Sequence, residues 1–167
     1  MKKAPARTAK PRAGARATPA APAAPRRERS ATMLNGGVDR LHQVAMTARN
    51  LDESVAFYRD VLGFTVVNQS EPGDNFDWGM LRLDDAVLML NTAYERDDRP
   101  PTPDDSRIIA HDDTGLFFSC PDVDAVYVHL REKGVSVKPP KVAPYGMKQL
   151  YVKDPDGYVL CFQWPAA

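Results

Sequence analysis

Alternating apolar and polar residues divide most of the chain into two units with the same order of elements. In the first unit we expect a strand over residues 41–47, a helix over 51–62, and strands over 64–69, 78–83 and 86–91. In the second we expect a strand over residues 115–120, a helix over 123–133, a short strand over 135–137, and strands over 147–152 and 158–163. Residues 92–112 form a polar connection. Each unit therefore has the order β-α-β-β-β.

The first helix has clear boundary signals. Leu51, Val55 and Tyr58 recur at helical spacing, which places them on one apolar stripe. Asn50 precedes the stripe as a candidate N-cap, and Gly63 follows it, where a left-handed residue commonly ends a helix. In the second unit, residues 154–157 (Asp-Pro-Asp-Gly) have the composition of a tight turn between two strands.

The two units are copies of one module. Residues 51–59 are echoed by 123–131, and residues 86–90 by 158–162, both at a spacing of 72. Residues 77–80 match 144–147 at a spacing of 67, so the copies differ by about five residues near that turn. A duplicated module predicts a paired fold with a cleft between its halves.

These residues resemble the vicinal oxygen chelate superfamily, which includes glyoxalase I, extradiol dioxygenases, fosfomycin-resistance enzymes and bleomycin-resistance proteins. The resembling runs are residues 51–64 and 154–158, with Tyr145-Gly146 ahead of the second. The resemblance implies an α+β fold of two βαβββ modules whose curved sheets enclose a cleft, commonly completed by a homodimer. Module 1 would span about 39–92, the linker 93–112, and module 2 about 113–164, within a domain over residues 38–167.

Charge is unevenly distributed along the chain. The totals are 22 basic and 22 acidic residues, but residues 1–30 hold nine of the basic residues and one acid. We expect residues 1–37, which are rich in Ala and Pro, to form a disordered basic extension. The remainder carries 13 basic and 21 acidic residues, so we expect no nucleic-acid or membrane partner and some attraction for cations.

Cysteine usage and hydropathy indicate a cytoplasmic protein. The only cysteines, Cys120 and Cys161, fall within or at the end of predicted strands rather than in a spaced disulfide framework. No apolar run approaches the roughly 18 residues that span a bilayer.

Enzymes of the resembling superfamily place metal ligands on the first and last strand of each module. Those places correspond here to Gln43, Met89, Gly115 and Cys161, and Gln43 and Gly115 lie 72 residues apart, as do Met89 and Cys161. One amide, one thioether and one thiol do not match the oxygen and imidazole ligands of Mg²⁺, Mn²⁺ or Fe²⁺. We therefore expect neither a metal nor another cofactor. A Cu(I) site on the two sulfur atoms, or simple packing of both, are the alternatives.

Other side chains offer weaker chemistry. A displaced metal site would need His42, His111 and Glu95, although strand alternation turns His42 toward the helix side, as a buried or edge residue. Glu95, at the exit of a predicted strand, is the candidate general acid or base.

The expected cleft lining is mixed, with apolar, thioether, amide and hydroxyl groups. Alternation and loop position select Gln43, Thr47, Trp78, Met89, Asn91, Tyr94, Phe117, Tyr145, Tyr151 and Cys161 as candidate ligand-binding residues. Alternation also places Arg49 on this face. Such a wall suits an organic ligand held by shape and a few hydrogen bonds.

The preferred hypothesis is a binding protein for a small cationic or aromatic molecule, in the manner of bleomycin-resistance proteins and antibiotic resistance by sequestration. The alternatives are a metal-dependent glyoxalase-like lyase or dioxygenase with displaced ligands, and a metal-free isomerase or lyase that uses Glu95.

Overall fold

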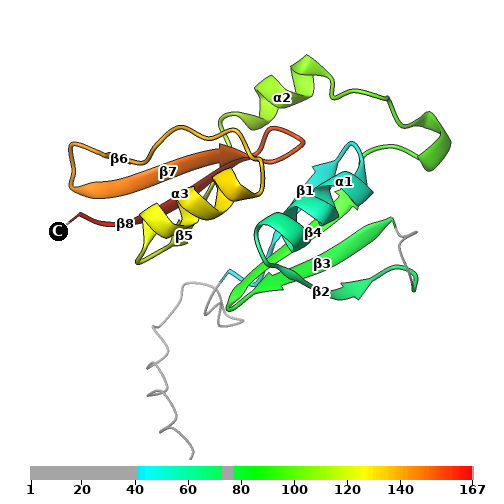
Figure 1. Ribbon diagram of the computed structural model, residues 1–167. Helices are drawn as coiled ribbons and strands as arrows, with labels where there is room; N and C mark the ends of the chain where they lie inside the picture. The colour runs from blue at the N-terminus through cyan, green and yellow to red at the C-terminus, as the bar shows by residue number, and fades with distance from the viewer. Residues whose placement is uncertain (1–40, 73–76, 167) are drawn as a thin grey trace, which may run out of the picture. The chain divides into compact units, whose positions relative to one another are not determined.

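The computed structural model describes residues 41–72 and 77–166, shown in colour in Figure 1. The extension predicted over residues 1–37 and the start of module 1 lie outside these ranges. Within them, no helix is both long and apolar enough to cross a membrane.

Each module forms one four-stranded mixed sheet (Figure 1). Module 1 has the order β1 (Val44–Ala48), β4 (Ala86–Thr92), β3 (Trp78–Leu83), β2 (Thr65–Gln69), and module 2 has β5 (Gly115–Ser119), β8 (Val159–Pro165), β7 (Met147–Lys153), β6 (Lys141–Val142). In both sheets the first strand is parallel to the last and the other pairings are antiparallel. The duplication extends to the register, because Val44 pairs with Leu88 just as Leu116 pairs with Leu160. The predicted pair of βαβββ modules is confirmed.

A helix covers the same face of each sheet. In module 1, α1 (Leu51–Ala56) continues into one π-helical turn, η1 (Phe57–Val61), whereas α3 (Val123–Glu132) serves module 2. The side chain of Asn50 accepts hydrogen bonds from the N–H groups of Asp52 and Glu53, so it is the predicted N-cap. Gly63 has φ 80°, as expected just past a helix end.

Between helices and sheets lies one apolar core shared by both modules. Its fully buried members include Leu51, Tyr58 and Leu81 from module 1, with Leu150 and Leu160 from module 2. Burying each leucine contributes about 1.5–3 kcal/mol of stability. The modules also meet through the rings of Phe64 and Phe118, whose centroids are 6.2 Å apart in edge-to-face geometry.

Two predictions about secondary structure are wrong. Residues 135–137 do not form a strand, because Val135 and Val137 pack against the core without a strand partner, and β6 forms after the two prolines instead. The polar connection contains η2 (Arg96–Asp98) and α2 (Asp105–His111). A helix this short depends on tertiary contacts, which local sequence does not reveal.

Candidate binding site

The face of the module 2 sheet that points away from α3 carries a row of three side chains. Phe117 on β5 pairs with Cys161 on β8, which pairs with Tyr151 on β7. Because side chains directly opposite one another share a face, these three form one row across the sheet. The neighbouring rows on this face are Gly115, Val159 and Lys153, and Ser119, Gln163 and Gln149. Alternation therefore brings Phe117, Tyr151 and Cys161 together.

Two aromatic rings in this row are exposed. Phe117 is 56% exposed and Tyr151 is 47% exposed, and their centroids lie 6.3 Å apart with the planes at 89°. Cys161 is fully buried, and this burial raises the pKa of its thiol, an effect partly offset by a hydrogen bond with Tyr151. The row therefore offers two aromatic faces over a neutral thiol.

A buried amide organises the polar side of the same face. Gln149 donates from Nε2 to Oε1 of Gln163 at 2.8 Å. Its own Oε1 accepts from the hydroxyls of Tyr145, at 3.0 Å, and Tyr151, at 3.2 Å. The amide is thus held in one orientation, and both tyrosine hydroxyl hydrogens are engaged. Alternation in the sequence places Gln163 on this face beside Cys161, but Gln149 escaped notice, although it alternates with Tyr151 and Lys153 along one strand.

A cavity of about 840 Å³ adjoins this face. It lies along β6 and β7 and is bounded on one side by the segment that precedes β6. Its lining includes Ser136, Val137, Lys138, Lys141, Val142, Gln149, Tyr151 and Lys153. The volume falls within the range of small-molecule pockets. Tyr145, which is 68% exposed, is not part of the lining but donates a hydrogen bond to the lining residue Gln149.

The outward face of module 1 gathers most of the other predicted site residues. Thr47 on β1 pairs with Asn91 on β4, which pairs with Trp78 on β3. Further along the same face, Nε2 of Gln43 lies 3.6 Å from the sulfur of Met89. Each of these five side chains is exposed or partly buried.

The four places where a metal would be expected do not fit one. Gln43 directs its amide at Met89, and Cys161 is a buried thiol whose pKa is raised by burial. A Cβ at Gly115 would lie 2.9 Å from the ring of Phe117, so that ring occupies the space a ligand side chain would need. Across residues 41–72 and 77–166, no group of three or more His, Cys, Asp and Glu could hold a metal ion.

A smaller cavity of about 420 Å³ lies between the starts of the two first strands. Gln43, Gly115 and Phe117 contribute to its lining. His42 also contributes, and its side chain is exposed at the entry to β1. Two of the four places where a metal would be expected, Gln43 and Gly115, therefore line this cavity, whereas Met89 and Cys161 do not.

The linker helix contacts two predicted ligand-binding residues, Thr47 and Tyr94, through Arg107. Arg107 on α2 donates to the carbonyl oxygen of Thr47 at 3.1 Å, and its guanidinium carbon lies 5.7 Å from the ring centroid of Tyr94. This contact is a cation–π interaction within the protein. Tyr94 thus lies apart from the module 2 row, while Glu95 beside it is exposed at the entry to η2.

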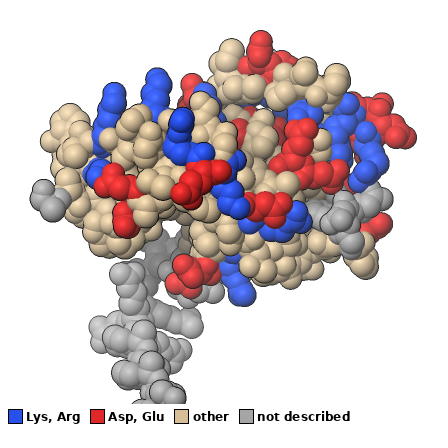
Figure 2. Space-filling model, viewed as in Figure 1, with Lys and Arg blue, Asp and Glu red and all other residues tan. Residues whose placement is uncertain are grey.

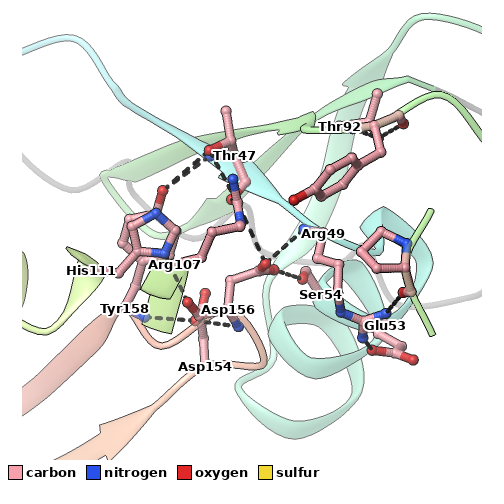
Figure 3. A network of polar contacts seen from close by, with 12 residues as sticks. Thr47, Arg49, Glu53, Ser54, Thr92, Arg107, His111, Asp154, Asp156 and Tyr158 are labelled. Atoms are coloured by element: carbon pink, nitrogen blue, oxygen red, sulfur yellow. Dashed lines mark hydrogen bonds and ion pairs between the residues drawn. The ribbon is translucent and has the colours of Figure 1, made fainter. Parts of the chain in front are cut away.

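The turn predicted over residues 154–157 forms, and its two aspartates are the centre of a buried polar hub (Figure 3). Asp156 accepts from the N–H of Arg49 at 2.6 Å and from the hydroxyl of Ser54 at 2.9 Å, and it lies 3.7 Å from Arg107. Arg49 is therefore buried in this hub rather than facing a cleft. His111 donates from Nδ1 to the Asp156 carbonyl at 2.8 Å, so it serves the hub.

Asp154 completes the hub with an unusual protonation equilibrium. It accepts hydrogen bonds from the hydroxyl of Tyr58 and from the N–H groups of Asp156 and Tyr158, all at 2.9 Å. Burial raises the pKa of Asp154 to about 6, even though these three donors favour the charged form. Burial and the neighbouring carboxylate together raise the pKa of Tyr58, so its hydroxyl stays protonated. The hub joins α1, α2 and the β7–β8 hairpin.

Paired βαβββ modules with mixed sheets and a covered core define the glyoxalase-type fold. Residues 40–162 match the Glyoxalase/Bleomycin resistance protein/Dioxygenase superfamily, which covers most of the chain. The chain belongs to this superfamily.

Relatives share the domain over nearly its whole length. The uncharacterized protein YaeR of Escherichia coli (strain K12) is 29% identical over 126 residues, which are 74% of this chain and 95% of YaeR. Glyoxylase I 4 of Arabidopsis thaliana is 30% identical over 122 residues, which are 72% of this chain and 67% of that protein. The structure of TnmS3, an antibiotic binding protein from Streptomyces sp. CB03234, aligns with a TM-score of 0.58 at 25% identity, covering 77% of this chain and 98% of TnmS3.

Proposed function

We propose that this chain is a binding protein for a planar aromatic organic molecule, held on the outward face of module 2. The observation that carries the proposal is the pair of exposed rings, Phe117 and Tyr151, of which Tyr151 lines a cavity of about 840 Å³. Stacking against such a ring contributes on the order of 0.5–1.5 kcal/mol beyond its buried area. The description of TnmS3 as an antibiotic binding protein supports the same kind of function.

The polar groups of the site favour binding over catalysis. The hydroxyls of Tyr145 and Tyr151 both donate to the buried amide of Gln149, which holds the wall of the cavity in place. Preorganised walls lower the entropy cost of holding a ligand. Cys161 is a neutral, buried thiol, a poor nucleophile and a poor ligand.

Binding of planar aromatic compounds by the full chain tests this proposal. We expect Tyr151→Ala to weaken the binding of a planar fluorophore by about fivefold to thirtyfold in Kd, because one stacking face is removed. Trp164→Ala is the matched control. Like Tyr151, Trp164 is an exposed aromatic residue, but it lies on β8 and outside the cavity lining. Equal effects of the two substitutions would refute the site.

The alternative is an enzyme of the kind named by the Arabidopsis relative, Glyoxylase I 4. It would require a metal bound away from the four expected places, because Gln43, Met89, Gly115 and Cys161 do not form a suitable donor set. Stoichiometric Fe, Mn, Zn or Ni retained by the purified protein through gel filtration would favour this alternative and count against the binding protein.

The proposal includes a homodimer in the cytoplasm. Phe117 and Tyr151 are large apolar groups on an otherwise open sheet face, and a second copy would cover part of that surface. Both cysteines are free thiols, which suits a reducing compartment. Sedimentation that detects only monomer at tens of micromolar protein would contradict the dimer.

A further inference from the structure

We propose that the ligand of the module 2 site is an anion, a planar aromatic molecule that carries a carboxylate or sulfonate group. This inference rests on the proposed function, because it adds a charge to the aromatic ligand already argued for the same cavity. It reverses the expectation from overall composition, in which the 21 acids outside residues 1–30 favour a cation. Local charge at the cavity decides the preference, because salt screens exposed charges beyond about 10 Å.

The cavity lining carries three lysines and one acid. These are Lys138, Lys141, Lys153 and Asp112. Lys153 forms an ion pair with Asp112 at 2.7 Å, so these two charges cancel. Lys138 and Lys141 are exposed, and neither forms an ion pair with any residue that the structure describes. The cavity therefore has two uncompensated positive charges. In Figure 2, Lys and Arg side chains project along the β6–β7 side of module 2.

One of these charges lies on the ligand-binding side of the sheet. Lys141 on β6 pairs directly with Gln149 on β7, so the two side chains share a face. Gln149 in turn holds the hydroxyl of Tyr151. An ammonium group and an aromatic ring thus border the same cavity, at a separation that a flexible lysine stem can adjust.

Hydrogen-bonding capacity supports the same conclusion. The hydroxyls of Tyr145 and Tyr151 both donate to Gln149, and Gln149 donates to Gln163, so both tyrosine hydroxyls and one amide N–H of Gln149 are engaged within the cluster. The ammonium groups of Lys138 and Lys141 remain as strong donors at the cavity. An acceptor on the ligand is best satisfied there, where a charged donor makes a stronger hydrogen bond than a neutral one.

A matched pair of fluorescent probes tests whether the site prefers an anionic ligand. Anilinonaphthalenesulfonate and N-phenylnaphthylamine share a planar aromatic frame, but only the first carries a sulfonate. We expect Lys138→Gln with Lys141→Gln to weaken binding of the sulfonate probe by about fourfold to twenty-five-fold at low salt, at roughly twofold to fivefold for each exposed charge. Binding of the neutral probe should change less than twofold.

The control changes net charge equally on the other side of the sheet. Lys133 follows α3, and Lys148 is paired with Asp124 on α3, so Lys133→Gln with Lys148→Gln removes two charges outside the cavity. This control should leave both probes unaffected. Equal loss of the sulfonate probe in both double variants would overturn the inference, because net charge alone would then explain it.

The outcomes also separate this inference from the proposed function. If both probes bind equally well, depend on Tyr151 and ignore the lysines, the aromatic site stands and the anion inference is wrong. If neither probe depends on Tyr151, the proposed site is wrong and the anion inference fails with it. Selective loss of the sulfonate probe in the Lys138 and Lys141 variant, with both probes weakened by Tyr151→Ala, supports both.

Discussion

Replacing Asp154 with asparagine should remove a specific part of the pH dependence of stability. Asp154 is buried in the hub, and the pKa of its carboxyl group is raised to about 6 from an ordinary value of 3.8. Asparagine mimics the protonated form, because its oxygen can accept from the N–H groups of Asp156 and Tyr158 while its NH₂ group faces the Tyr58 oxygen.

The direction of this pH dependence follows from how tightly the folded and the unfolded protein bind the Asp154 proton. The folded protein binds the Asp154 proton more tightly than the unfolded chain, so this group contributes stability that is fully present below pH 3.8. That contribution is lost as the pH rises through about 6. At about 1.4 kcal/mol for each tenfold difference in proton affinity, the change amounts to about 3 kcal/mol.

Urea unfolding of both proteins from pH 4 to pH 8 measures this effect. The free energy of unfolding of the wild type, minus that of Asp154→Asn, should fall by about 2 kcal/mol across this range, because the rest of the effect lies below pH 4. Asp97→Asn removes an exposed carboxylate outside the hub and is the matched control. A difference between wild type and Asp154→Asn that stays constant with pH would refute the argument that burial dominates at Asp154.

Three further comparisons test backbone strain, helix capping and core packing. Gly157→Ala should lower stability more than Gly63→Ala, because a Cβ at Gly157 would lie 2.9 Å from the backbone of Ile108, whereas nothing lies within 4 Å at Gly63, and both glycines have positive φ. Equal losses of stability in thermal unfolding would contradict this. Asn50→Ala should cost about 0.5–2 kcal/mol through loss of the N-cap, with lower helicity by circular dichroism. Leu160→Ala should cost about 2–5 kcal/mol in urea, and a loss below 1 kcal/mol would argue against a tight core there.

The local sequence pattern was sufficient to predict the helices and most of the strands that repeat in the two modules. Asn50 and Gly63 mark the ends of the first helix through short-range hydrogen bonding and backbone freedom, and both signals are present in the sequence. The helix α2 escaped prediction because its support is distant: Arg107 reaches Thr47 on β1, and His111 reaches the turn at Asp156. The strand expected over residues 135–137 failed because apolar residues there pack on the core without a hydrogen-bonding partner.

For the site, alternation in the sequence by itself placed Phe117 and Cys161 on one face, and the repeat of 72 residues located the places where a metal would be expected. Tyr151 was a candidate only as an aromatic residue near a strand end, and strand pairing brings it into the same row. Only the tertiary structure decided the surroundings of those residues. The cavity, its lysines and the Gln149 amide come together through strand pairing, and α2 contacts Thr47 and Tyr94 through Arg107. Periodicity is a local property of the backbone, whereas a binding site is made by contacts between residues far apart in the chain.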